Sequence, residues 1–465
     1  MQSVLARNGA IPVAPGRIPG IGHALSLLNR PLEFLRSLPG VGPLVHVDIG
    51  RLPMIVVTDA TLTRQVLTDS KTFDKGGALF DKVVPLTGLS LLTSKYDMHR
   101  RQRRLMQPAF SQARIKVYAD TMNEVIDEVL GEWVEGSVVD MAEATYQITS
   151  RTAARTMFAS RIAGGLVDQI VEALGIYLNG LFLRMMEPTG VFGKIPTPGN
   201  IRYNRAVALL HQNVDEIIDS YRKSGVDHGD LLSMLLAEDE EGEEEGEEEG
   251  EKLTLEEVHN QVITLFLAGI ETTGGTLGWA LYFLGANPDI AKRMAAEVDS
   301  VLGGRPPQWE DIANLHEVRR VITEGLRMYP AGWIFTREVM TDTELGEYHL
   351  AKGTGIAYSP YLLHRNPEVF ANPDVFNPDR WLPERAKLIP RDAFVPFGGG
   401  VHKCIGDQFG LTEITLALAK IASKWNFQAQ WTTPIEPTPR RATLTPTRMP
   451  MRITRRCAAQ KLHSA

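Results

Sequence analysis

Cys404 lies in a glycine-rich run whose residue types suit the ligation of a metal ion by a single thiolate. The run reads Phe397-Gly-Gly-Gly-Val-His-Lys-Cys-Ile-Gly406. Its three consecutive glycines let the backbone turn tightly and approach a flat partner closely. His402 and Lys403 place positive charge beside the sulfur, and a helical pattern begins at Asp407. Because cations and a helix N-terminus both stabilise negative charge, we expect Cys404 to be a thiolate.

The other cysteine, Cys457, lies in a basic C-terminal stretch and cannot form a Cys-x-x-Cys metal site with Cys404. Two cysteines in 465 residues exclude a disulfide scaffold and suit a reducing compartment. A lone cysteine is usually a small buried hydrophobe, but the flanking glycines and the following helix favour a ligand. A single axial thiolate suits haem iron, because it pushes electron density toward O–O cleavage.

The spacing Phe-x-x-Gly-x-His-x-Cys-x-Gly, with five residues at fixed offsets, resembles the haem-binding signature of the cytochrome P450 superfamily. The resemblance covers essentially the whole chain. It implies a mainly α fold, a large helical body with a small β-rich part in a single domain. It also implies haem b (iron protoporphyrin IX), whose iron is ligated by Cys404, with Phe397 and Gly398 beside the cofactor.

A second motif, Ala268-Gly-Ile-Glu-Thr-Thr273, lies in the middle of a long apolar-faced helix. Ala268 and Gly269 leave a groove on one helix face, over which a flat cofactor or dioxygen can sit, so both are predicted cofactor-binding residues. Glu271 and Thr272 place an ionisable group and a hydroxyl beside this groove. Taken alone, the small residues could merely allow close helix packing, with Thr272 bonding back to its i−4 carbonyl. The motif matches the family's pattern Ala/Gly-Gly-x-Asp/Glu-Thr. That match implies that Thr272 hydrogen-bonds oxygen at the haem and that Glu271 is the acid of a proton relay.

The run Glu324-Gly-Leu-Arg327 puts a carboxylate and a guanidinium on one helix face, where they can pair. Glu317-Val-Arg-Arg320 has the same pattern seven residues earlier. We choose the later pair because Met328-Tyr-Pro330 follows it, as in the family. Arg380, in Phe376-Asn-Pro-Asp-Arg-Trp381, resembles the residue that completes a buried triad with Glu324 and Arg327. Since buried charges must be paired, the expected role of this triad is structural.

The run His99-Arg-Arg-Gln-Arg-Arg104 forms a dense basic helical face. One turn of charge without interleaved aromatic residues is weak support for a nucleic-acid site, and we expect no nucleic-acid partner. The family pattern His/Trp-x-x-x-Arg matches His99 and Arg103. The resemblance implies that these two residues, together with Arg337 and His402, bind the haem propionates through charge-assisted hydrogen bonds.

Arg100 and Arg104 would then point away from the haem. Together with Lys403 they predict a basic patch on the thiolate side of the cofactor, where an acidic ferredoxin would dock.

Segments that line the substrate pocket in relatives map onto apolar stretches with few charges. If these stretches line a cavity instead of forming ordinary core, the cavity suits a hydrocarbon-like substrate held by shape. The predicted pocket residues are Leu79, Phe80, Val84, Phe182, Met185, Leu265, Phe266, Trp333, Ile334, Phe335 and Leu444.

The elements that must position these side chains are mostly helices, without internal repeats or a clear linker, so we expect one domain over residues 1–465. The predicted helices cover 61–68, 98–107, 114–134, 142–158, 166–183, 201–223, 254–285, 290–302, 309–314, 318–328 and 408–424. Strands are predicted at 44–47 and 54–57, within 334–358 and within 430–455.

Composition places the chain among ordinary globular proteins, with 43% hydrophobic and 23% charged residues. No apolar stretch reaches the roughly eighteen residues of a membrane span, and the N-terminus lacks a signal-peptide core, so we expect a cytoplasmic protein without a membrane anchor. Residues 238–251 hold eleven acidic side chains, without which the net charge of −7 would be +4. We predict that this tract is a disordered loop and that 456–465 is a flexible tail.

These features predict a haem-thiolate monooxygenase that inserts one oxygen atom of O2 into a C–H bond of an apolar small molecule. No flavin or iron–sulfur domain is recognisable, so the resemblance implies a separate ferredoxin and its NAD(P)H-dependent reductase. Three runs, Trp333–Arg337, Tyr358–Tyr361 and Phe376–Arg385, resemble bacterial sesquiterpene hydroxylases of the pentalenene oxygenase type. A cyclic terpene is therefore the preferred substrate. A fatty acid, a steroid or a macrolide stays open, as does a haem-binding sensor or carrier, which would have no need of Glu271 and Thr272.

Overall fold

Helices make up most of the structure, a computed structural model that describes residues 10–50, 52–77, 80–158, 164–185, 191–237, 252–437 and 443–456. Local signals explain where they begin: the Thr254 hydroxyl accepts from the Glu257 N–H in a capping box at the start of the longest helix. The helices are α1 (Ala24–Asn29), α2 (Pro31–Ser37), α3 (Ala60–Thr68), α4 (Val84–Thr87), α5 (Tyr96–Met106), α6 (Gln112–Gly131), α7 (Met141–Met157), α8 (Gly164–Met185), α9 (Pro198–Ser224), α10 (Leu231–Leu236), α11 (Leu255–Ala286), α12 (Pro288–Leu302), α13 (His316–Met328), α14 (Pro360–Leu363), α15 (Pro383–Ala386) and α16 (Asp407–Lys424).

The β structure is a minor part and forms small sheets. The largest has the strand order β1-β2-β8-β5-β3, in which β2 and β8 run parallel and the other neighbours antiparallel. A second sheet has the order β4-β10-β9, and β6 pairs with β7. The strands are β1 (Leu44–Ile49), β2 (Leu52–Val57), β3 (Phe73–Asp74), β4 (Val138–Asp140), β5 (Phe335–Val339), β6 (Thr343–Leu345), β7 (Tyr348–Leu350), β8 (Gly355–Tyr358), β9 (Trp425–Ala429) and β10 (Pro450–Arg455).

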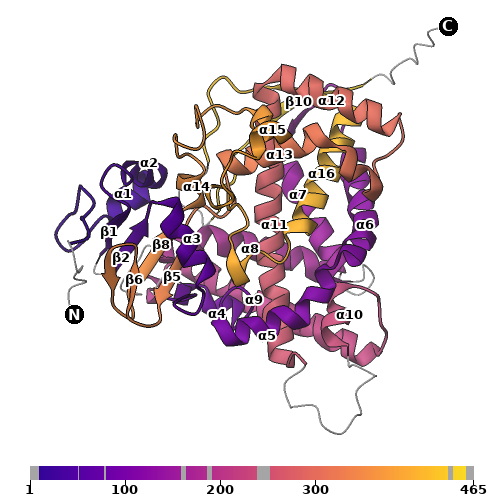
Figure 1. Cartoon of the computed structure of the whole chain (residues 1–465). Helices are drawn as coiled ribbons and strands as arrows, with labels where there is room; N and C mark the ends of the chain where they lie inside the picture. The colour runs from indigo at the N-terminus through magenta and orange to yellow at the C-terminus, as the bar shows by residue number, and fades with distance from the viewer. Residues whose placement is uncertain are drawn as a thin grey trace.

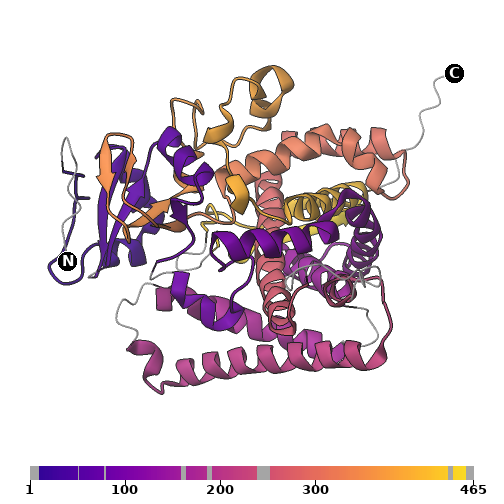
Figure 2. The same cartoon turned by 60° about the horizontal axis from the view of Figure 1, so that its bottom comes forward.

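The five-stranded sheet lies to one side of a large helical body (Figure 1). Helix α11 runs through the middle of this body, where it contacts α7, α13 and α16. Turning the molecule shows α9 as a long helix along one side of the body, packed on α8 and on α11 (Figure 2). The mainly α fold with a small sheet part agrees with the prediction from sequence.

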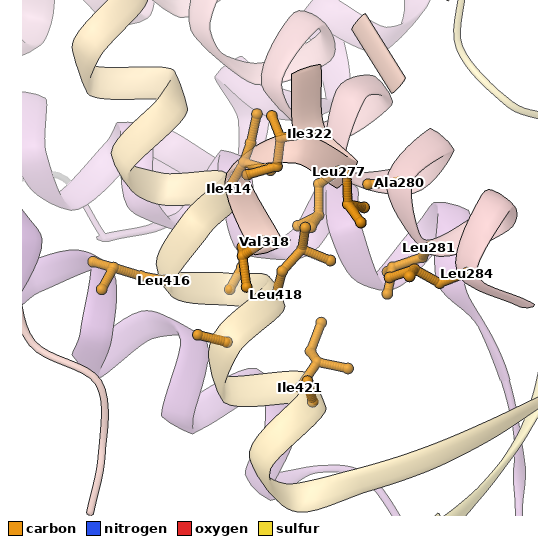
Figure 3. Close-up of a cluster of buried hydrophobic side chains, with 14 of the residues drawn as sticks. Leu277, Ala280, Leu281, Leu284, Val318, Ile322, Ile414, Leu416, Leu418 and Ile421 are labelled. Carbon is orange, nitrogen blue, oxygen red and sulfur yellow. The ribbon is translucent and has the colours of Figure 1, made fainter. Parts of the chain in front are cut away.

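One cluster of buried hydrophobic side chains lies where α11, α13 and α16 meet (Figure 3). Leu277 of α11, Val318 of α13 and Leu418 of α16 are completely buried there. Burying each such side chain contributes roughly 1.5–3 kcal/mol relative to its exposure. This packing sets α16 rigidly against α11. It thereby positions the Cys404 loop, which immediately precedes α16, relative to the Ala268–Thr273 motif of α11.

The predicted helices agree with the structure to within a few residues, and the predicted 309–314 helix is a 3-10 helix, η4 (Trp309–Asn314). Strand β9 begins at Trp425, ahead of the predicted 430–455 range, because the apolar pattern changes period directly after α16 without an intervening turn signal. The short helices α1, α2, α4, α10, α14 and α15 were not predicted, since too few residues carry a helical period.

Some predictions fall on parts of the chain outside the described residues, namely the acidic tract 238–251, Leu79 and residues 457–465. Arg456, the first residue of the predicted tail, pairs with Asp299 at 2.6 Å. Across the described ranges, no helix is both long enough and apolar enough to cross a membrane.

Candidate active site

The loop before α16 holds Cys404 through backbone contacts that require glycine. The Cys404 N–H donates to the Phe397 carbonyl at 2.9 Å. Gly398 and Gly400 have φ values of 69° and 62°, in the left-handed region that glycine adopts without strain. A Cβ on Gly400 would lie 2.0 Å from the carbonyl oxygen of Leu67 in α3. The glycines therefore serve close packing of the loop on α3 as well as its tight turn.

The Cys404 side chain has accessible surface, yet burial by surrounding protein is the main cause that raises its pKa. The Gly406 N–H and the charges of Arg103 and Lys403 lower this pKa, but they do not outweigh desolvation. The neighbouring charges and the Gly406 N–H thus act in the predicted direction, and the thiolate form of Cys404 stays a prediction. A metal ion on the sulfur would supply the missing charge, because a coordinating thiol is deprotonated outright.

Three basic side chains, Lys75, His99 and His402, interact with Asp74, and Arg337 interacts with Lys75 and His402. We call these four basic residues the basic cluster. The imidazoles of His99 and His402 meet edge to face with centroids 4.4 Å apart. His402 Nε2 lies 3.3 Å from Asp74 Oδ1 without the direction of a hydrogen bond. Arg337 and Lys75 are buried beside them. Asp74 alone does not satisfy the polar atoms of these side chains, so the cluster has capacity for further negative charge.

The electrostatics of the basic cluster point to the same missing anion. Burial, followed by the charges of Lys75, His402 and Arg103, lowers the pKa of His99 to about 2. Burial and then Arg337 hold the pKa of Lys75 well below its usual value. Within the described part of the chain, Nδ1 of His99 and Nδ1 of His402 are buried without a hydrogen-bond partner. Two haem propionates would provide the acceptors and the charge that these groups lack, so the residues fit the cofactor.

The structure brings Arg103 to the Cys404 loop. Its guanidinium donates to the Lys403 carbonyl and, at 2.9 Å, to Gln107 Oε1. This contact ties α5 to the loop, and a propionate contact of Arg103 stays a prediction. Sequence reasoning missed Asp74 and Lys75, which no motif marks. They join the cluster because β3 pairs with β5, the strand that carries Arg337.

The Ala268–Thr273 motif opens a gap in the otherwise buried middle of α11. Ala268 is exposed and Thr272 is half-buried, whereas Phe266 and Ile270 are buried. Thr272 Oγ1 donates to the Ala268 carbonyl at 2.5 Å, which is the back-bonding that the sequence left open. In this rotamer the hydroxyl can only accept a hydrogen bond from a ligand, and it must turn to donate one.

Glu271 faces a different side of α11 from Ala268 and Thr272. Together with Gly274 and Gly275 it lines a cleft of about 1110 Å³ between α7, α8 and residues 445–448. The residue itself is buried. A carboxyl in this position can exchange protons with water in the cleft while its backbone neighbour Thr272 faces the gap. The two residues are thus adjacent in sequence but open to different spaces.

The predicted triad assembles around a fully buried carboxylate. Glu324 receives hydrogen bonds from Arg327 Nη2 at 2.8 Å, Arg380 Nε at 3.1 Å and Trp381 Nε1 at 2.9 Å. Arg327 also donates to the carbonyls of His364 and Pro373. The competing motif, Glu317 with Arg320, forms a separate ion pair nearer the surface. These contacts anchor the irregular segment 364–381 to α13.

The predicted pocket residues divide by exposure. Phe266, Phe182, Trp333 and Leu444 are buried in core clusters, which gives them at least a packing role. Phe80, Val84, Leu265, Ile334 and Phe335 are half-buried and retain surface for a ligand. Leu79 and the side chain of Met185 lie outside what the structure describes.

The chain belongs to the cytochrome P450 family, whose sequence model matches residues 12–452. It is a haem-dependent monooxygenase that uses O2, an organic substrate and electrons from redox partners.

Similar proteins of known name come from Streptomyces. Cyclooctat-9-en-7-ol 5-monooxygenase of Streptomyces melanosporofaciens is 44% identical, with 89% of each chain covered. Cyclooctatin synthase of the same organism is 42% identical over 94% of each chain. Pentalenene oxygenase of Streptomyces avermitilis is 40% identical over 96% of this chain and 98% of the relative. Among solved structures, the haem domain of cytochrome P450DA superposes with a TM-score of 0.84 at 29% identity, covering 96% of this chain and 98% of that one.

Proposed function

We propose that this chain hydroxylates a cyclic terpene, with a sesquiterpene as the first candidate. The observation that carries the proposal is the set of relatives that are at least 40% identical to this chain. They are named for cyclooctat-9-en-7-ol, cyclooctatin and pentalenene. The first of these names denotes an alkenol and the last an alkene. The half-buried apolar residues of the predicted pocket support it, because a hydrocarbon skeleton offers shape and little polarity for recognition.

In this proposal each group has a defined task. Cys404 holds the haem iron from the loop side, and the basic cluster holds the propionates. Haem, when bound, activates dioxygen so that one oxygen atom enters a C–H bond. Thr272 hydrogen-bonds at the gap in α11, and Glu271, which lines the cleft on another side of the helix, is the acid of the proton relay.

The test is an optical titration of the purified ferric enzyme with cyclic sesquiterpenes, a fatty acid and a steroid. We expect a low-spin to high-spin shift of the Soret band with the terpenes alone, because a substrate that fits displaces water from the iron. A shift with the fatty acid or the steroid alone would assign the substrate to that class. A reduced carbon monoxide complex without a thiolate-type spectrum would refute the role of Cys404.

For the redox partner we propose an acidic ferredoxin that docks on the basic patch. Arg100 and Arg104 of α5 are exposed, and α5 is tied to the Cys404 loop through Arg103. Lys403 is exposed as well, but Asp407 lies 2.6 Å from its Nζ and offsets its charge. The two arginines are therefore the main source of positive charge on this face.

Replacing both residues, Arg100→Glu with Arg104→Glu, should slow reduction by ferredoxin and weaken the dependence of the rate on salt. Reversal of two exposed cations on α9, Arg222→Glu with Lys223→Glu, is the matched control. Equal reduction rates in both double variants would dismiss the patch.

A further inference from the structure

Two histidines on different helices face each other directly beside the predicted pocket. His211 of α9 and His259 of α11 approach with Nδ1 and Nε2 2.8 Å apart. Their ring planes differ by 4° and their centroids are 5.1 Å apart, as expected for two rings joined in line by one N–H···N bond. On the far side of His259, Nδ1 lies 2.6 Å from Oδ1 of Asp215, one turn along α9 from His211.

His211 also reaches a third element. It makes a hydrogen bond with the backbone of Pro85 in α4, and proline has only a carbonyl to offer, so a His211 N–H must be the donor. The chain just after α4 lies close on α11, where a Cβ on Gly88 would be 2.3 Å from the Asn260 side chain. The pair thus joins α9 and α11 to the segment that carries Phe80 and Val84.

The proton count of this assembly is decided by its geometry. The contacts with Pro85 and between the rings each need one proton. Asp215 attracts a third proton to Nδ1 of His259, although this contact lacks the direction of a hydrogen bond, so the two rings then share three protons among four nitrogens. A fourth proton would have to enter the His211–His259 contact, where two N–H groups cannot stand 2.8 Å apart. One added proton therefore breaks the bond between the helices.

We propose that the His211–His259 pair is a proton-sensitive clasp that positions the pocket-lining segment 80–87 and thereby controls access to the haem. The role of the pair depends on the proposed pocket. His211 and His259 are positioning residues that do not touch the substrate. Its role is to hold α4 against α9 and α11, so that the wall of the pocket is ordered when the clasp is closed.

The direction of the pH effect follows from His211. Burial and then the charge of His259 hold its pKa below the usual value. An opened clasp would return His211 to water, where its pKa is about 6.5. The open form then binds the proton more readily, so the closed form is favoured above about pH 6.5 and loses stability as the pH falls below it.

The charged groups around the pair have little influence on its titration. Asp215 is 68% exposed, so its attraction is screened by solvent. On α11, Glu257 is engaged by Arg101 of α5. α4 contributes no titratable side chain. The groups packed near α9 from α8 and α10 are engaged elsewhere, Arg184 with Asn200 and Asp230 with Tyr221.

The test is the association rate of carbon monoxide with the reduced holoenzyme after flash photolysis, followed between about pH 5.5 and 8. In the wild type the association rate of carbon monoxide should rise as the pH falls. The equilibrium constant for closing the clasp should decrease by up to about tenfold for each pH unit. His211→Gln and His259→Gln, which cannot titrate, should show a fast rate that no longer depends on pH. His316→Gln, at an exposed histidine of α13, is the matched control and should behave as the wild type.

A wild-type rate independent of pH, or the same pH dependence in His211→Gln, would overturn the clasp. A thiolate-type carbon monoxide spectrum at each pH ensures that the haem site is intact during the measurement. Carbon monoxide binds whatever the natural substrate is. Failure of the terpene titration would therefore refute the proposed function without contradicting the clasp. An association rate of carbon monoxide that the variants leave unchanged would refute the clasp without contradicting the proposed function.

Discussion

Glu324 and Arg327 form an ion pair from which solvent is fully excluded. Both side chains have 0% exposure, and Arg327 Nη2 lies 2.8 Å from Glu324 Oε1. The carboxylate also accepts from the Asn377 N–H at 2.9 Å and from Arg380 and Trp381. Such a pair is stable only while every member is present, because removing one partner leaves a buried charge without compensation.

Glu324→Gln should therefore destabilise the folded enzyme strongly, by about 3–5 kcal/mol. The exposed pair of Arg30 and Glu33 provides the control, since Glu33→Gln should cost at most about 1 kcal/mol. Denaturant unfolding of the two variants measures the difference. Equal losses would mean that the buried triad does not organise the segment 364–381.

Thr272→Ala should separate consumption of reductant from formation of product. The variant loses the hydroxyl at the gap in α11 but leaves the haem-binding residues unchanged, so electrons still enter while protons are delivered less effectively. Thr272→Ser keeps the hydroxyl and should retain most of the coupling. The ratio of product to NAD(P)H consumed is the measurement, and undiminished coupling in the alanine variant would refute the role of Thr272.

Lys75→Met should stabilise the protein without haem and weaken the retention of haem by the protein that contains it. Without haem, the variant removes a buried cation that lowers the pKa values of His99 and His402, so the basic cluster becomes less strained and the apoprotein more stable. With haem, the variant would lack one charge of the basic cluster that we propose binds the propionates, so the cofactor should dissociate faster. Thermal unfolding of the apoprotein and haem transfer to an apoglobin check the two signs. A less stable apoprotein with unchanged haem loss would contradict both.

Glu413 of α16 should make stability depend on pH. Burial raises its pKa to about 8, partly offset by Thr152. The unfolded chain releases this proton near pH 4.3, whereas the folded chain keeps it. Stability should therefore fall by about 1.4 kcal/mol per pH unit as the pH rises toward 8 and then level off.

Glu413→Gln stays neutral and should lose this slope, so that it unfolds at a higher temperature than the wild type above pH 7. Glu384→Gln, at an exposed position of α15, is the control and should leave the slope as it is. Melting temperatures of the wild type and both variants between about pH 6 and 9 test this prediction. A parallel dependence on pH in the Glu413 variant would mean that this carboxyl is not the cause.

Much of the architecture could be predicted from the sequence. The apolar face of the sequence predicted the long helix at 254–285, and the structure has it at 255–286. The spacing around Cys404 predicted a turn packed closely on a partner, and the left-handed Gly398 and Gly400 agree with it. These features depend on residues close together in the chain, so local conformational preferences suffice to predict them.

Contacts between distant segments were harder to predict. Glu324 and Glu317 begin the same Glu-x-x-Arg motif, and only packing against 364–381 buries the first. Lys75 and Asp74 join the basic cluster through the pairing of β3 with β5, some 260 residues apart. The side of α11 that Glu271 faces depends on α7 and α8.

The sequence by itself determined the helical body, the glycine-rich loop that carries Cys404 and the types of residue in the Ala268–Thr273 motif of α11, because short-range spacing encodes them. Tertiary structure alone decided which charges lose contact with water, and with them the pKa values of Cys404 and His99. It also decided that His211 and His259 meet. Desolvation and long-range pairing depend on every element packed around a group, and no local pattern records that environment.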